Sequence, residues 1–138
     1  ARENARRKAV AVAAQMPNRR VMGVDTVVAL DGRIFGKPTD EQDATATLTR
    51  LSGRTHTVVS GLALLPDGER VALTSVTFRT LTEEQIARYV SFGEWQGRAG
   101  GYAIQERGAW LVERIAGEYA NVVGLPVGAL LDLAPDLL

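Results

Sequence analysis

A short turn signal joins two long β-rich segments in the middle of this chain, and this pattern limits its possible folds more than any other feature. Pro66-Asp67-Gly68 separates Thr55–Leu65 from Arg70–Leu81. Turn residues between two such runs predict a β-hairpin. The second run also alternates along its length with the two-residue period of a strand. The chain is therefore expected to contain a sheet with a long antiparallel hairpin.

The first third of the chain predicts one helix followed by a shorter hairpin. Small apolar residues recur at helical spacing from about Arg2 to Gln15, and Pro17 ends the pattern. The apolar run Val21–Leu30 predicts a buried strand. Asp31-Gly32 predicts a tight turn, after which Arg33–Phe35 would return as a short partner strand.

The remaining segments alternate between helices and strands. The expected elements are a helix from Thr39 or Asp40 to Gly53, a helix from Glu83 capped by Thr82, a glycine-rich loop at Gly93–Gly101, strands at Tyr102–Ile104 and Trp110–Ile115, and a helix from Pro126 through Leu133. Neither a repeat nor a linker interrupts this pattern. Residues 1–138 are therefore expected to form a single domain of the α/β or α+β class.

Composition argues against several classes of function. Sixteen basic and sixteen acidic residues balance, so the chain lacks the basic excess of a nucleic-acid-binding protein. The absence of cysteine removes disulfides, zinc-thiolate sites and thiol nucleophiles, and is compatible with a reducing cytoplasm. His56 is the single histidine, so neither a multi-histidine metal site nor a Ser-His-Asp triad is expected. No segment approaches the roughly 20 apolar residues that span a bilayer, and no membrane partner is expected.

Asp25 is the strongest candidate for chemistry. It interrupts the apolar strand within Gly23–Val28. An ionised carboxylate at the end of a buried strand lowers stability unless a partner or a metal offsets its desolvation. Such a residue suits a general base for water or a ligand of Mg²⁺. The alternative interpretation is a turn or cap aspartate bonded to backbone amides.

Two lysines and one glutamine are the further candidates. Lys37 lies in Gly36-Lys37-Pro38 after the first hairpin, where a rigid loop suits neutralisation of a phosphate. Lys8 lies on the predicted N-terminal helix, and either lysine is alternatively an ordinary solvent-facing residue. Gln105 offers a donor and an acceptor to the edge of a nucleobase, or else belongs to an ordinary loop.

Four other side chains carry weaker expectations. Arg98 is expected to pair with a phosphate or with Glu94. His56 is expected to be structural, and Trp95 and Trp110 are expected to lie in the core or at an interface.

Six segments, taken in order, resemble the Maf family of nucleoside triphosphate pyrophosphatases. They are Ala5-Arg6-Arg7-Lys8-Ala9, Gly23-Val24-Asp25-Thr26-Val27-Val28, Gly36-Lys37-Pro38, Leu51-Ser52-Gly53-Arg54-Thr55-His56, Ala99-Gly100-Gly101-Tyr102-Ala103-Ile104-Gln105 and Asn121-Val122-Val123-Gly124-Leu125-Pro126. Single short motifs are weak, but six in the family's order are strong. The resemblance implies an α/β fold like that of inosine triphosphatases, with a mixed twisted sheet, flanking helices and two lobes around a central cleft. It also implies a homodimer.

The resemblance further implies an activity and a role for each matched residue. Members of the family hydrolyse a nucleoside triphosphate to a nucleoside monophosphate and pyrophosphate. Asp25 would accept a proton from water and bind a divalent cation, Mg²⁺ or Mn²⁺. Lys8 and Lys37 would hold the phosphates. Thr26 and Gln105 match positions that set base choice and are similar to the subgroup that acts on dTTP and UTP.

Three departures from the family pattern leave other functions open. Val24 replaces an alanine and Glu106 replaces a glycine. The chain begins at the Ala-x-x-Lys-Ala helix, so the domain is expected to be N-terminally truncated, without the family's earlier strand and Ser-x-Ser-Pro-Arg-Arg loop. One alternative function is a house-cleaning pyrophosphatase for a modified purine triphosphate. Another is a non-catalytic nucleotide-binding or division-regulating protein.

Overall fold

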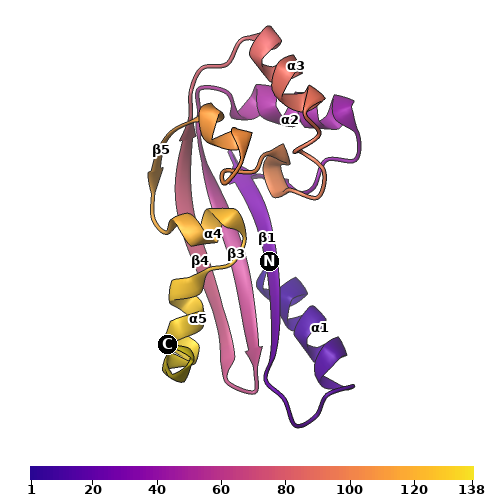
Figure 1. Ribbon diagram of the computed structural model, residues 1–138, viewed down its shortest axis with the longest axis vertical. Helices are drawn as coiled ribbons and strands as arrows, with labels where there is room; N and C mark the ends of the chain where they lie inside the picture. The colour runs from indigo at the N-terminus through magenta and orange to yellow at the C-terminus, as the bar shows by residue number, and fades with distance from the viewer.

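A five-stranded sheet runs the length of the molecule, and helices cover both of its ends (Figure 1). The computed structural model describes all residues, 1–138. In chain order the elements are α1 (Arg2–Ala13), β1 (Val21–Leu30), β2 (Arg33–Phe35), α2 (Glu41–Leu51), β3 (Thr55–Leu65), β4 (Gly68–Phe78), α3 (Glu83–Ser91), η1 (Ala99–Gly101), η2 (Arg107–Leu111), β5 (Val112–Ala116), α4 (Tyr119–Val123), α5 (Val127–Leu133) and η3 (Pro135–Leu137), where η marks a 3₁₀ turn. None of the helices has the length and apolar character needed to span a bilayer.

The strands lie in the order β2-β1-β3-β4-β5, and every neighbouring pair is antiparallel. The α/β class with flanking helices is confirmed, but the expectation of a mixed sheet is wrong. Tight turns join β1 to β2 and β3 to β4, and such turns connect antiparallel strands only. The expected long hairpin is confirmed as β3–β4. Its second strand runs over 68–78, because residues 79–82 leave the sheet toward α3.

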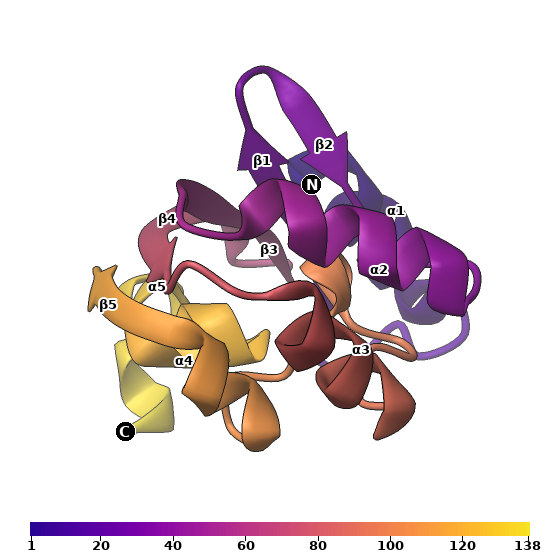
Figure 2. The same cartoon turned by 90° about the horizontal axis from the view of Figure 1, so that it is seen from above.

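The upper lobe forms where α2 and α3 lie across one end of the sheet (Figure 2). A cluster of 15 buried apolar residues fills the space beneath them, with Leu48 from α2 and Phe78 from β4 among its members. Both helices begin at the side-chain caps that the sequence predicts. Asp40 accepts the backbone N–H of Asp43 at 2.7 Å, and Thr82 forms a capping box at the start of α3.

The lower lobe forms where α1 packs against β1 and β3. Ala5 and Ala9 are fully buried in this contact, where they form a small core with Val21 and Ala63. Gly23 permits the close approach, because an added Cβ would collide with the carbonyl oxygen of Ala5. The small side chains therefore fix the distance between α1 and the sheet, and with it the position of every residue on α1.

The segment between α3 and α5 differs most from expectation. Tyr102–Ile104 is not a strand: its three side chains are buried in the core, and its backbone runs into a turn. The expected strand at Trp110–Ile115 begins only at Val112, because Trp110 belongs to η2. The sequence did not predict α4 at all, whereas α5 confirms the helix expected after Pro126.

Candidate active site

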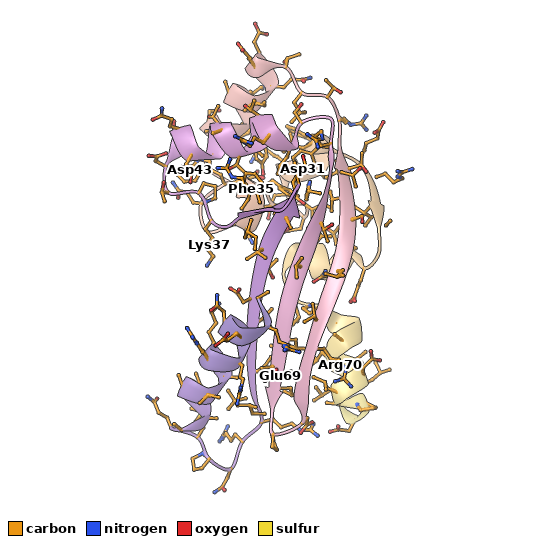
Figure 3. The ribbon with its side chains drawn as sticks, turned by 180° about the vertical axis from the view of Figure 1, so that it is seen from behind. Asp31, Phe35, Lys37, Asp43, Glu69 and Arg70 are labelled. Atoms are coloured by element: carbon orange, nitrogen blue, oxygen red, sulfur yellow. The ribbon has the colours of Figure 1, made fainter.

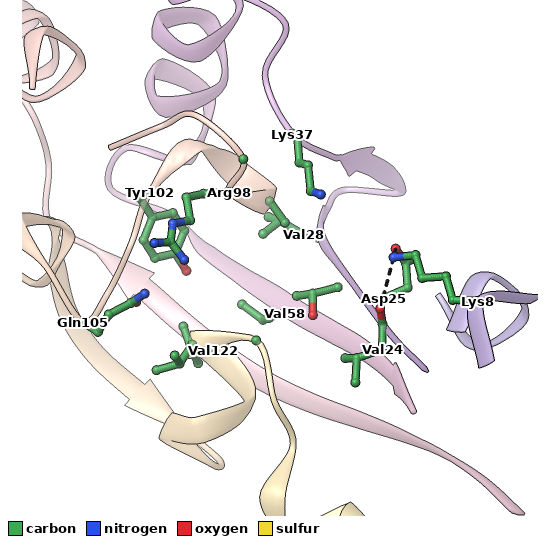
Figure 4. A pocket seen from close by; sticks show the side chains of 15 residues that line it. Lys8, Val24, Asp25, Val28, Lys37, Val58, Arg98, Tyr102, Gln105 and Val122 are labelled. Carbon is green, nitrogen blue, oxygen red and sulfur yellow. Dashed lines mark hydrogen bonds and ion pairs between the residues drawn. The ribbon is translucent and has the colours of Figure 1, made fainter. Parts of the chain in front are cut away.

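A cleft of about 200 Å³ lies between the two lobes. All five residues expected to carry the chemistry line it: Lys8, Asp25, Thr26, Lys37 and Gln105 (Figure 4). They come from α1, from β1, from the turn after β2 and from the segment before η2. The fold therefore gathers candidates from distant parts of the sequence around one space.

Asp25 lies in the middle of β1 rather than at its end, which corrects the sequence-based expectation. Because β2 pairs with β1 only over residues 28–30, this side of β1 has no strand partner beside Asp25. The side chain is 18% exposed, and its Oδ1 lies 3.4 Å from Lys8 Nζ. Asn4 Nδ2 donates to the other carboxylate oxygen at 3.4 Å. Both hydrogen bonds are long, so the carboxylate is balanced by a cation without being tightly held.

Two lysines face the cleft from different lobes. Lys8 on α1 donates to the carbonyl oxygen of Val24 at 3.1 Å, which keeps its ammonium group beside the strand. Lys37 projects from the upper lobe (Figure 3) and takes part in no ion pair. Its turn is fixed by Gly100, whose N–H donates to the carbonyl oxygen of Gly36 at 3.1 Å. A polyphosphate in the cleft would thus meet one ammonium group from each lobe.

Thr26 and Gln105, the residues expected to choose the base, lie at different depths in the cleft. The Thr26 hydroxyl shares a hydrogen bond of 2.8 Å with the hydroxyl of Ser60, which is fully buried. This contact holds the Thr26 hydroxyl against the neighbouring strand β3. Gln105 is exposed and extends into the cleft from the side opposite Lys8 (Figure 4). One group is therefore held rigidly, and the other is free to adjust to a ligand.

Arg98 also lines the cleft, and the alternative pairing with Glu94 is wrong. Glu94 instead binds the guanidinium of Arg107 at 3.2 Å and accepts the Tyr89 hydroxyl at 3.0 Å. Arg98 is left without an ionic partner, on the same side of the cleft as Gln105 (Figure 4). It is available to an anionic or aromatic ligand.

A buried aromatic group supports the cleft from behind. His56 Nε2 and the Tyr102 hydroxyl are 2.7 Å apart, and both rings pack edge to face on Phe78. Burial lowers the pKa of His56 to about 4, so the imidazole is neutral near pH 7. Burial also raises the pKa of Tyr102. The structural role expected for His56 is confirmed by this packing, whereas Trp110 is 65% exposed and is not a core residue.

The short helix α4 brings a further wall to the cleft. Asn121 is fully buried, and its Nδ2 donates to the carbonyl oxygen of Val58 at 3.3 Å and to the Thr74 hydroxyl at 3.0 Å. These bonds tie α4 to the centre of the sheet, so that Val122 and Gly124 reach the cleft. The hydrogen bonds of Asn121 therefore stabilise α4, which is too short to be stable as an isolated helix.

A comparison with the sequences of known protein families shows the family of this chain. The sequence profile described as Maf-like protein matches residues 1–137. The chain belongs to the Maf family.

Several curated relatives of this Maf-family chain are named dTTP/UTP pyrophosphatase. The protein of Dictyoglomus turgidum is 47% identical over 131 residues, covering 91% of this chain and 68% of the relative. That of Pyrococcus abyssi is 42% identical over 132 residues, covering 94% and 71%. That of Moorella thermoacetica is 50% identical over 125 residues, covering 87% and 64%. This chain thus spans 64% to 71% of the length of these relatives.

The carboxylate content of this Maf-family cleft limits how a metal would be held. No group of three or more carboxylate or histidine side chains is placed to bind an ion, and Asp25 is the single carboxylate among the lining residues. Mg²⁺ commonly binds through one or two carboxylates while the phosphates of a substrate and water complete its coordination. The cleft fits a cation that arrives with a nucleotide, and does not fit one held by protein alone.

Three residues that shape the site had no role predicted from the sequence: Asn4, Tyr102 and Asn121. Asn4 precedes Lys8 by four positions on a predicted helix, and this spacing places both on one face. That signal was sufficient to find it. Asn121 opens the last family motif, but its role depends on contacts with β3 and β4 that no local pattern reveals.

Proposed function

We propose that this Maf-family chain hydrolyses nucleoside triphosphates to nucleoside monophosphates and pyrophosphate, with dTTP and UTP as preferred substrates. One observation carries the proposal: Asp25 lies in a cleft between Lys8, 3.4 Å away, and Lys37 of the other lobe. This arrangement offers a base for water and two cations for a triphosphate. The names of the curated relatives support the substrate class.

In this mechanism Asp25 is the general base. Water attacks the α-phosphorus, and the proton that water loses passes to the Asp25 carboxylate. The bond from the α-phosphorus to the oxygen that bridges it to the β-phosphorus breaks. Its electron pair leaves with pyrophosphate. Lys8 and Lys37 stabilise the negative charge that accumulates on this leaving group.

Base choice is assigned to Thr26 and Gln105. Uracil and thymine present an N3–H donor between two carbonyl acceptors, and the amide of Gln105 carries one donor and one acceptor in a plane. Thr26, held by Ser60 at 2.8 Å, borders the space that the ribose and base would share. Val122 of α4 lines the same cleft and borders the space that is left for the base.

A divalent cation, Mg²⁺ or Mn²⁺, is part of the proposal. Asp25 would hold it together with phosphate oxygens of the substrate, and when bound it would neutralise phosphate charge. The homodimer implied by the family resemblance and the cytoplasmic location, with which the absence of cysteine is compatible, stay predictions. Light scattering after size-exclusion chromatography would test the first of these.

The test is pyrophosphate release from dTTP, UTP, CTP and GTP in the presence of Mg²⁺ or Mn²⁺. We expect turnover to favour dTTP and UTP. Asp25→Asn keeps the shape of the side chain but removes the base, and should lower kcat by about 10²–10⁴-fold. Retained turnover in this variant contradicts the role of Asp25. Preference for GTP would favour the purine alternative, and binding without turnover would favour a nucleotide-binding protein.

A further inference from the structure

A second groove lies on the upper lobe, and none of its lining residues lines the active-site cleft. Its volume of about 360 Å³ is in the range of small-molecule sites. It forms where α3 meets the connection from β4 and the 3₁₀ turn η2. Arg79 N–H donates to the carbonyl oxygen of Leu111 at 2.8 Å, and the Arg107 guanidinium lies 4.3 Å from the Phe92 ring centroid. These contacts fix the three segments relative to one another.

The groove presents aromatic surface to solvent. Trp110 is 65% exposed and Phe92 is 39% exposed, although tryptophan is highly buried in most proteins. The half-buried Leu81 and the buried Leu111 also line the groove. A flat, exposed indole next to an apolar floor suits a planar ligand that stacks on it.

The groove also carries positive charge that the protein itself does not neutralise. Arg79 and Arg88 line it, and neither side chain forms an ion pair or a hydrogen bond. No lining residue is acidic. Elsewhere, Arg20 binds Asp136 at 2.7 Å and Arg107 binds Glu94 at 3.2 Å. Two free guanidinium groups beside an apolar floor favour an anion, and their fork geometry matches phosphate.

We propose that this groove binds a mononucleotide, with its base stacked on Trp110 and its phosphate held by Arg79 and Arg88. The two halves of the site match the two halves of such a ligand, one planar and aromatic, the other anionic. Stacking on an aromatic side chain tolerates every base. This site therefore differs from the cleft in accepting purine and pyrimidine nucleotides alike.

One side chain joins the groove to the cleft. Tyr89 lines the groove, and its hydroxyl accepts the backbone N–H of Ala103 at 3.0 Å. Ala103 follows Tyr102 and precedes Gln105 by two positions, and both of these residues line the cleft. Tyr89 is buried beside the groove, so a single side chain separates a nucleotide bound there from the segment that carries Gln105. We therefore expect occupancy of the groove to change KM for dTTP more than kcat.

The experiment uses AMP as the probe, since the cleft is expected to disfavour purines. Calorimetric titration of the full chain should show AMP binding, and tryptophan fluorescence should be quenched to saturation. Arg88→Ala should weaken AMP binding at least tenfold. Arg50→Ala is the matched control, because Arg50 lies in the last turn of α2 as Arg88 does in α3, and is also exposed and without an ionic partner. It should leave the affinity unchanged.

Two more variants separate the groove from the cleft. Trp110→Phe, at an exposed position, should abolish the quenching, and Lys37→Ala in the cleft should leave AMP binding intact. The proposal is overturned if AMP does not bind, or if Lys37→Ala removes binding that Arg88→Ala preserves. Pyrophosphate that binds as tightly as AMP would also overturn it, because the base would then contribute nothing.

Discussion

Lys8 is placed so that it can serve Asp25 before the substrate arrives and the phosphates afterwards. Its ammonium lies 3.4 Å from the carboxylate, while 56% of the side chain is exposed. The hydrogen bond to the carbonyl oxygen of Val24 holds it near the strand at 3.1 Å. An exposed ammonium with one backbone contact can turn toward a phosphate at little cost in free energy. The lysine side chain is flexible, and its three N–H donors rotate freely.

Removal of Lys8 tests this role directly. Lys8→Ala should lower kcat/KM for dTTP by about 10²–10³-fold, the usual effect of losing one preorganised group that stabilises transition-state charge. Arg7→Ala is the matched control, because Arg7 is the adjacent cation on α1 and binds Glu3 at 3.1 Å on the exposed face. Steady-state pyrophosphate release measures both. Equal losses would point to the net charge of α1 instead of Lys8 itself.

His56 makes stability depend on pH. Its pKa is lowered to about 4 by burial, whereas an unfolded histidine titrates near pH 6.5. Between these values the unfolded chain binds a proton that the folded chain does not. The free energy of unfolding should therefore fall by about 3 kcal/mol as the pH drops from 7 to 4.

Urea unfolding at a series of pH values measures this dependence. Carboxylates add their own loss of stability toward pH 4, but His56 is the single histidine and accounts for the slope between pH 5 and 7. His56→Gln keeps a hydrogen-bonding group for the Tyr102 hydroxyl and does not titrate. It should flatten that part of the curve. A slope that persists in the variant would assign the proton to another group.

At the scale of elements, the position of α1 decides whether Lys8 reaches Asp25. The helix approaches β1 closely because Gly23 has no side chain, and an added Cβ would meet the backbone of Ala5 and Ala9. Gly23→Ala should displace α1 and lower kcat/KM at least tenfold, with a loss of about 1–3 kcal/mol in stability from overpacking. Gly36→Ala is the control for stability alone, since nothing lies within 4 Å of its added Cβ but the residue belongs to the turn that carries Lys37. Urea unfolding compares the two variants, and turnover of Gly23→Ala is compared with that of the unmodified chain.

The contrast between β1 and α4 shows how much the sequence reveals at this scale. The apolar run, the Asp31-Gly32 turn and the caps at Asp40 and Thr82 are local signals, and all predicted their elements correctly. Tyr102–Ile104 misled the prediction, because its apolar residues fill the core without pairing in the sheet. The helix α4 depends on Asn121 bonds to β3 and β4, which only the folded chain brings together.

The same distinction applies to the site. Asp25, Lys8 and Lys37 were identified from residue types and motifs, and the fold places all three in one cleft. The free edge of β1 beside Asp25 was not predictable, because it follows from the shortness of β2 and its pairing at only 28–30. The sequence likewise did not reveal that Arg98 has no ion pair with Glu94, since Glu94 is paired with Arg107 in the folded chain.

At the scale of the whole molecule, each lobe contributes its own lysine to the proposed substrate site. Lys8 belongs to the lower lobe and Lys37 to the upper lobe, and the sheet is the link between them. A nucleotide held by both lysines would therefore stabilise the folded protein as one unit. A dTTP analogue with a methylene group between the α- and β-phosphorus atoms is the suitable ligand, because it cannot be cleaved at that bond.

Binding of this analogue should raise the free energy of unfolding by about 2.7 kcal/mol when its concentration is 100 times Kd, which appears as a higher Tm in a thermal scan. At the same ligand concentration Lys8→Ala and Lys37→Ala should each reduce the rise in Tm, although they lie on different lobes. The corresponding dGTP analogue should give a smaller rise in the unmodified chain. A rise that survives Lys37→Ala would mean that the triphosphate lies against the lower lobe alone, and Lys37 would then have no part in binding it.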